Sequence, residues 1–157
     1  MQHTVLIIDD DEKLRSFVTA ALEAEGIKTF CAETAQEGIS LALMNPPDLI
    51  LCDVVLPDAL GFEAARALND NPITSNVPVV LMTGYPYMRS NGVSAQWRLL
   101  SKPFSMNSML HTVAGVLRSS FNVHWRKDRG TNGDGSERLN DLHFTNAEKR
   151  GERGSST

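Results

Sequence analysis

The sequence predicts an α/β domain in which a parallel five-stranded sheet is covered by helices on both faces. Short apolar runs alternate five times with segments whose apolar residues recur at helical spacing, which is typical of such a sheet. The run Leu49 to Cys52 is apolar throughout, as expected of a strand buried on both faces, and it ends abruptly at Asp53. Apolar residues make up 41% of the 157 residues, enough for the core of one ordinary domain.

The first two predicted helices have clear start and stop signals. Asp11 is placed to cap the first helix, and Gly26 is placed to end it. Thr34 and Glu37 have the spacing of a capping box, in which the glutamate reaches back to the helix start. In chain order we expect strand 4–8, a helix from 14 to Gly26 with Leu14, Phe17, Val18, Ala21 and Leu22 on its inner face, strand 27–31, a helix from 34 to the Pro46-Pro47 pair, strand 49–52, helix 62–68, strand 77–82, and strand 97–101.

The segment 85–95 is the least regular part of this pattern. It contains Pro86 and Asn91-Gly92 and has no clean apolar stripe, so we expect the helix before the fifth strand to be shortened. After the fifth strand, Ser105 is placed to cap a last helix, with Met106 and Met109 on its inner face.

The composition changes after Arg118. Residues 119–157 are rich in Gly, Ser, Asn, Arg and Asp and have almost no apolar periodicity, which is typical of a disordered segment. We therefore predict one domain over residues 1–118 and a polar, disordered tail over 119–157, with a frayed continuation of the last helix at its start. We expect no attached DNA-binding output domain.

Charge and cysteine content narrow the class of protein. The net charge of −4 argues against a dedicated nucleic-acid binder, which usually carries a basic surplus. The sequence has no long apolar span and no export signal, so we expect a cytoplasmic protein that does not contact membranes. Cys31 and Cys52 lie in apolar runs and are expected to be buried, inert thiols.

Polar side chains follow four of the five strands at the point where each strand ends. Asp9 and Asp10 follow the first strand, Asp53 the third, Thr83 the fourth and Lys102 the fifth. Because the carboxyl ends of parallel strands meet at one edge of the sheet, we expect these side chains to share one cleft. Two unit charges about 4 Å apart repel by roughly 4 kcal/mol at an effective dielectric of 20, so three carboxylates require a cation among them. Oxygen-only ligands favour a hard cation such as Mg²⁺.

A carboxylate beside a dication and a lysine can act as a nucleophile toward a phosphoryl group. The dication and Lys102 would neutralise charge on the transferring oxygens, and the Thr83 hydroxyl would hydrogen-bond to one of them. A phosphoryl group on Asp53 would change the local charge and draw Thr83 and Lys102 inward, which would shift the loops that hold them.

The whole set resembles the receiver domain of bacterial two-component response regulators, over residues 4 to about 118. The motifs occur in the family's order and near its spacings: Asp9-Asp10, Asp53 with Pro57 and Gly61, Thr83-Gly84, and Lys102-Pro103-Phe104. The resemblance implies a flavodoxin-like, doubly wound sheet with strand order 2-1-3-4-5.

The resemblance also implies roles for individual residues. Asp53 is the phospho-acceptor of this phosphoprotein. Asp10 and the backbone carbonyl of Val55 join Asp53 in binding Mg²⁺, and Asp9 contributes through water. Of these, Asp53, Asp10 and Asp9 are the acidic residues already expected in the cleft.

Two further roles, and two departures from the family pattern, concern the last two strands. Thr83 is the switch hydroxyl and Lys102 pairs with the phosphoryl group, with a cis bond between Lys102 and Pro103.

An aromatic switch residue is common three positions before this lysine, where this sequence has Leu99, and the segment between Thr83 and Lys102 is a few residues short. These departures concern the surface formed by the fourth helix and the fifth strand, through which members of the family commonly signal or dimerise. Trp97 is a substitute for the aromatic or, as we favour, a packing residue.

The leading functional hypothesis is a receiver that takes a phosphoryl group from a sensor histidine kinase or a histidine phosphotransfer protein. It would signal to a downstream protein by conformational change, or relay the phosphoryl group onward. A weak homodimer is one possible oligomeric state. Catalysis would be limited to self-phosphotransfer and weak autodephosphorylation, so we do not expect an enzyme in the usual sense.

We weigh three alternatives at the level of sequence, of which the first and the third remain open. Asp9-x-Asp11 after an apolar strand is similar to the nucleophile motif of haloacid-dehalogenase-type phosphatases, although Lys13 stands where threonine or valine is usual. A flavin-binding protein of the same fold is disfavoured because three aspartates would repel a phosphate. The third alternative is a receiver-like module that only docks partners.

Overall fold

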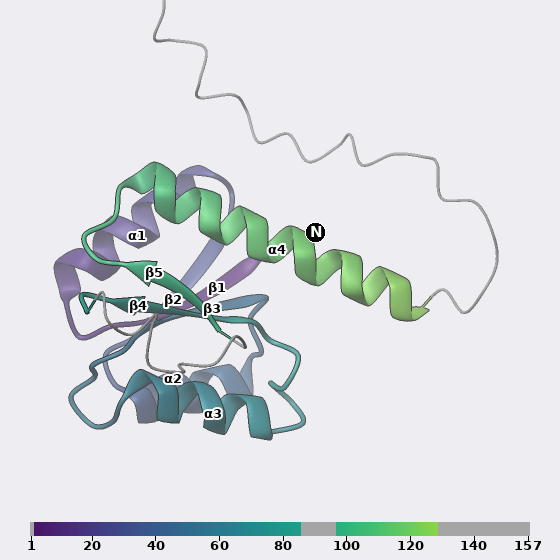
Figure 1. The fold of residues 1–157 in the computed structure, drawn as a ribbon, viewed down its shortest axis with the longest axis horizontal. Helices are drawn as coiled ribbons and strands as arrows, with labels where there is room; N and C mark the ends of the chain where they lie inside the picture. Colours follow the sequence, from purple (N-terminus) through teal and green to yellow (C-terminus); the bar gives the residue numbers. More distant parts are fainter. Residues whose placement is uncertain (1, 86–96, 129–157) are drawn as a thin grey trace, which may run out of the picture.

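The computed structural model describes residues 2–85 and 97–128, and these residues form the predicted doubly wound fold. One parallel sheet has the strand order β2-β1-β3-β4-β5. Helices α1 and α4 cover one face of the sheet, and α2 and α3 cover the other (Figure 1). The elements are β1 (Thr4–Ile8), α1 (Glu12–Ala24), β2 (Lys28–Ala32), α2 (Ala35–Met44), β3 (Leu49–Asp53), α3 (Gly61–Asp70), β4 (Val79–Thr83), β5 (Arg98–Ser101) and α4 (Met106–Asp128).

The two faces of the sheet have separate apolar cores. Side chains alternate between the faces of a strand, so neighbouring residues of one strand enter different cores. In β1, Val5 and Ile7 pack under α1 and α4, whereas Leu6 and Ile8 pack under α2 and α3. The central strands β1, β3 and β4 are buried on both faces, which explains why their sequences read as continuous apolar runs.

Strand register brings the chemically active strand ends level with one another. Ile8 of β1 pairs with Cys52 of β3, so the residues that follow them, Asp9 and Asp53, are neighbours across the sheet. Alternation continues the series Val5, Ile7, Asp9 on the face covered by α1 and α4, and Leu49, Leu51, Asp53 on the same face. Both carboxylates therefore point to the same side.

The helix signals in the sequence are confirmed, with one change of partner. Asp11 caps α1 by accepting from the backbone N–H groups of Lys13 and Leu14, and Gly26 follows the helix with a φ of 76°. Thr34 caps α2 by accepting from the N–H of Glu37 at 3.2 Å. The Glu37 carboxylate, however, accepts from the N–H of Glu33 rather than completing the predicted capping box at Thr34.

Two residues predicted for the core are at the surface. Phe17 is 39% exposed because it lies about a quarter turn from the centre of the buried stripe of α1. Met106 is 45% exposed; it is the first residue of α4, and the helix enters the core only from Met109 onward. Met109, one turn further along the helix, is fully buried as predicted.

Helix α4 continues past Arg118 as far as Asp128, and its last turns extend beyond the sheet (Figure 1). The shortened helix expected before β5 and the tail predicted to be disordered both involve residues outside the described ones, 86–96 and 129–157. Among the helices in the described part of the chain, none combines the length and the apolar character needed to cross a membrane.

The loop between β3 and α3 folds back tightly on the end of β3. Val55 and Leu60 form an antiparallel bridge, and the N–H of Gly61 donates to the Val54 carbonyl at 2.7 Å. A Cβ atom at Gly61 would lie 2.2 Å from the carbonyl oxygen of Asp53. The loop can therefore close at this point only because residue 61 has no side chain.

Replacing Gly61 with alanine should destabilise the fold by about 1–3 kcal/mol, because the backbone at Asp53 must move to admit the methyl group. Urea unfolding of Gly61→Ala against the parent protein measures this change. Gly115→Ala is the matched control, since its new Cβ meets only the end of the Arg98 side chain at 3.3 Å. The control should be neutral or slightly stabilising. Equal effects of the two substitutions would contradict this account of the loop.

Candidate phosphorylation site

Three carboxylates and one lysine meet at the carboxyl edge of the sheet. Oxygen atoms from Asp9, Asp10 and Asp53 all lie within 4.8 Å of one another. The Lys102 Nζ lies 2.8 Å from Oδ2 of Asp9 and 3.3 Å from Oδ2 of Asp53. The structure thus brings together four of the residues predicted for the site, and Lys102 already contacts both carboxylates before any inward movement.

The electrostatics of the site follow from burial and from charge crowding. The pKa of Asp53 is raised, chiefly because burial disfavours the charged carboxylate and next because of the charge of Asp9. The Lys102 ammonium and the N–H of Val55 oppose this rise. For Lys102, burial alone would lower the pKa, but the hydrogen bond to Asp9 and the two negative charges outweigh burial and raise it. Lys102 is therefore held as a cation between the carboxylates.

The donor set at this edge suits a hard divalent cation. Each of Asp9, Asp10 and Asp53 offers a carboxylate oxygen, and no nitrogen or sulfur ligand belongs to the group in the part of the chain described. Oxygen ligands of this kind suit Mg²⁺. Asp10 is exposed and Asp9 is completely buried, which fits a cation held from the solvent side. The predicted ligand role of the Val55 carbonyl stays a prediction.

Thr83 lies on the same edge but is held differently from the charged residues. It is the last residue of β4, and its Oγ1 accepts from the N–H of Tyr85 at 3.0 Å. Its carbonyl accepts from the N–H of Lys102 at 2.7 Å, which joins the ends of β4 and β5. Alternation along β4 places Thr83 on the opposite face from Met82, which packs in the core shared with α1 and α4. The Lys102–Pro103 bond is cis, as expected.

Two residues that contact this region were not among the predicted site residues. Arg15 of α1 donates to the carbonyl of Asp9 at 2.6 Å and to a carboxylate oxygen of Glu33 at 2.8 Å. Asp58, in the loop after β3, is exposed but accepts from the backbone of α2. These two N–H groups, those of Gln36 and Ala35, lower the pKa of Asp58. Arg15 and Asp9 are 6 residues apart, and the other partners are 18 to 23 residues apart, so no helical or strand periodicity identifies them.

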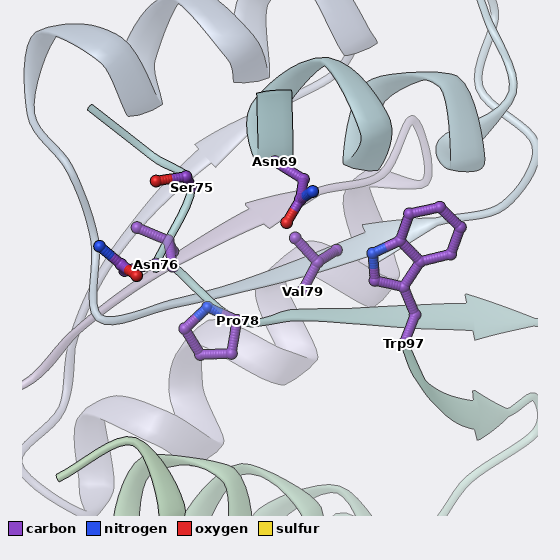
Figure 2. Close-up of a pocket in the computed structure, with 7 residues that line it drawn as sticks. Asn69, Ser75, Asn76, Pro78, Val79 and Trp97 are labelled. Carbon is purple, nitrogen blue, oxygen red and sulfur yellow. The ribbon is translucent and has the colours of Figure 1, made fainter. Parts of the chain in front are cut away.

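Trp97 lies far from the acidic cluster and acts as a packing residue. Its ring lies 6.3 Å from that of Phe62, and Leu99 in β5 packs partly against the same core. Figure 2 shows Trp97 facing a small pocket of about 190 Å³, also lined by Asn69, Ser75, Asn76, Val77, Pro78 and Val79. The pocket lies at the amino end of β4, about 13 Å along that strand from Thr83. It is not part of the acidic site.

The cysteines lie near the site but do not take part in it. Cys52 is buried, and its pKa is raised to about 12 by burial first and then by the charges of Asp53 and Asp9. Such a thiol stays protonated and unreactive, as predicted. The prediction of burial is wrong for Cys31, which is half-buried on β2 beside Thr19, whose Oγ1 lies 3.6 Å from its Sγ.

The environment of Asp9 argues against the phosphatase hypothesis. Asp9 is completely buried, Oδ1 accepts from the N–H of Asp11, and Oδ2 accepts from Lys102. A nucleophile needs an oxygen that substrate can reach, whereas both oxygens of Asp9 are engaged. Asp53 is only partly buried, so substrate can reach it more easily than Asp9, and it is the better nucleophile of the two.

Comparison with known proteins identifies the family. The response regulator receiver domain model matches residues 5–114. PilH of Pseudomonas aeruginosa is 32% identical over 120 residues, which cover 72% of this chain and 96% of that protein. The phosphate regulon transcriptional regulatory protein PhoB of the same organism is 32% identical over 118 residues, covering 73% of this chain; the match spans only about half of PhoB, 52%.

Solved structures agree with the sequence comparison. The chemotaxis response regulator CheY4 of Vibrio cholerae superposes with a TM-score of 0.69 at 25% identity, covering 74% of this chain and 99% of that one. Family model, relatives and fold therefore point the same way: the chain belongs to the response regulator receiver domain family.

Proposed function

We propose that this chain is a phospho-accepting receiver that takes a phosphoryl group on Asp53 from a histidine kinase or a histidine phosphotransfer protein. The observation that carries the proposal is the contact of one lysine with two carboxylates, those of Asp9 and Asp53, at the shared edge of β1 and β3. Receiver domains generally bind Mg²⁺ at an acidic pocket, and the three clustered aspartates offer such a pocket here. Asp10, Asp53 and the Val55 carbonyl would hold the ion directly, with Asp9 behind them.

The proposed reaction is a displacement at phosphorus. An Asp53 carboxylate oxygen forms a bond to the phosphorus atom while the bond from phosphorus to the donor histidine nitrogen breaks, and the electron pair of that bond leaves with the nitrogen. The bound Mg²⁺ supplies charge neutralisation on the phosphoryl oxygens. Lys102, held as a cation by Asp9, also stabilises the negative charge on the phosphoryl oxygens. Hydrolysis of the acyl phosphate restores Asp53.

The proposal extends to a switch at Thr83, the last residue of β4. In the described structure the Thr83 hydroxyl accepts from the N–H of Tyr85. A phosphorylated Asp53 would offer acceptor oxygens to which this hydroxyl can donate, and its reorientation would alter the turn that follows β4. The change would reach the surface on either side of residues 86–96 and pass the signal to a downstream protein, or the group would be relayed onward.

The wider assignments belong to the same proposal. We place the chain in the cytoplasm with its phosphoryl donor, with a protein rather than nucleic acid or membrane as its downstream partner and weak self-association as one arrangement. We treat residues 1–118 as the receiver and 119–157 as a separate polar segment. Val55 and Tyr85 are both about half exposed beside the site, where their apolar surface would hinder water from reaching the acyl phosphate.

Treatment with acetyl phosphate and Mg²⁺ should add one phosphoryl group to the chain, on Asp53. Intact mass followed by peptide mapping measures this on the parent, on Asp53→Asn and on Asp70→Asn, a control with the same chemical change at the far end of α3. The control should be labelled like the parent and Asp53→Asn should not. Label on Asp9 would instead support the phosphatase, and absence of label with intact partner binding would support a docking module.

The metal-free protein should become more stable when Asp53 is replaced by asparagine. Because the folded pKa of Asp53 is raised above its ordinary value of 3.8, ionisation costs more in the folded state, and this cost grows as pH rises above 3.8 and is complete above the folded pKa. The advantage of Asp53→Asn should therefore be largest near neutral pH and shrink toward pH 4. Urea unfolding in chelator from about pH 4 to 8 measures it. A difference that does not change with pH would contradict the cause given.

Replacing Val55 and Tyr85 together with small polar residues should speed loss of the phosphoryl group from Asp53. The two side chains are exposed apolar groups that flank the site, and their removal opens a path for water. Release of inorganic phosphate from the phosphorylated protein, after removal of the donor, measures the rate. The exposed pair Met44 and Ile73, changed in the same way, is the control. An unchanged rate in the first variant would remove the hypothesis.

A further inference from the structure

A series of polar contacts outside the acidic cluster connects the end of β1 to the loop after β3. We call this series the outer belt, and its side chains are those of Arg15, Glu33, Glu37 and Asp58. Receiver roles predicted from the sequence do not include any of them. The belt passes through the amino end of α2, which lies between the two acidic strand ends in the chain but carries no site residue.

The first part of the belt fixes the backbone at Asp9. Arg15 lies on α1 with little of its side chain exposed, and one guanidinium nitrogen donates to the Asp9 carbonyl at 2.6 Å. The other nitrogen donates to Glu33 at 2.8 Å. The N–H of Glu33 in turn donates to the carboxylate of Glu37, on the first turn of α2, at 2.9 Å. Arg15 therefore ties the backbone of Asp9 to the segment that leads into α2.

The second part of the belt fixes the loop after β3. Asp58 accepts from the N–H groups of Ala35 and Gln36 at 2.8 and 3.0 Å, one with each carboxylate oxygen. These are the first two residues of α2, whose N–H groups have no partner within the helix. The carboxylate also lies at the positive end of the helix dipole. Asp58 therefore ties the loop that contains Val55 to the start of α2.

Helix α2 is a fixed support for both parts. It lies so close to β1 that a Cβ atom at Gly38 would come within 2.3 Å of the Ile8 side chain. Ile8 is the residue directly before Asp9. The loop 54–60 is held by the burial of Val54 and Leu56, by the Val55–Leu60 bridge and by the N–H of Val54, which donates to the Met82 carbonyl. Asp58 adds a side-chain contact from this loop to α2.

We propose that Arg15 and Asp58 are positioning residues that act as one unit: through the start of α2 they set the spacing between the end of β1 and the Val55 loop. The proposal rests on the function proposed above, since that spacing matters only if Asp9, Asp10, Asp53 and Val55 hold one cation. Residues that orient metal ligands from behind typically change metal affinity by 10-fold to 100-fold when removed. Neither residue touches the reacting atoms.

The test compares Asp58→Asn and Arg15→Lys, alone and together, with the controls Asp70→Asn and Arg66→Lys on α3. Asp58→Asn keeps the shape but leaves only one acceptor oxygen, and Arg15→Lys keeps the charge but loses the fork that reaches two acceptors. Calorimetric titration gives the Mg²⁺ affinity of the full chain, and acetyl phosphate labelling at saturating Mg²⁺ gives the rate at Asp53. Thermal unfolding in chelator reports folding separately.

Each belt variant should bind Mg²⁺ about tenfold more weakly, with the labelling rate largely recovered at saturating Mg²⁺. Because the contacts are in series, the double variant should also lose about tenfold rather than a hundredfold. Lower melting temperatures with unchanged Mg²⁺ affinity would overturn the proposal, as would multiplicative losses. The parent protein is measured first: if it neither binds Mg²⁺ nor labels on Asp53, the proposed function fails, independently of the belt.

Discussion

The structure depends on how the negative charge at the carboxyl ends of β1 and β3 is compensated. Asp9 is completely buried and Asp53 is partly buried beside it, and burial of unpaired carboxylates would cost several kcal/mol. Lys102 makes the arrangement tolerable by contacting both. The raised pKa of Asp53 shows that this compensation is incomplete, because burial and the charge of Asp9 outweigh the lysine. The site therefore retains an electrostatic demand for a further cation.

Several features of the fold hold the acidic groups of this site together. The register of β1 against β3 puts Asp9 and Asp53 side by side, and alternation sends both to the same face. The absence of a side chain at Gly61 lets the loop after β3 close against the Asp53 carbonyl. Apolar cores on both faces make the strand ends rigid enough to hold groups that repel one another.

The family match explains some features of this structure, and the geometry of the chain adds others. The family match accounts for the strand order and for an acidic pocket of this general kind. The relatives differ in extent, since PilH is matched over nearly its whole length and PhoB over about half. The structure of this chain adds the position of Leu99 in β5, the packing of Trp97 on Phe62 away from the site, and the contacts of Arg15 and Asp58.

The sequence by itself determined the five strands, the fold class and the grouping of Asp9, Asp10, Asp53 and Lys102, because each depends on local periodicity and on the rule that parallel strand ends share an edge. Only the tertiary structure decided that Phe17 and Met106 are exposed, that Glu37 bonds to Glu33, and that Asp58 caps α2. These outcomes depend on which surface lies opposite a residue, and contacts between distant segments leave no periodic signal in the chain.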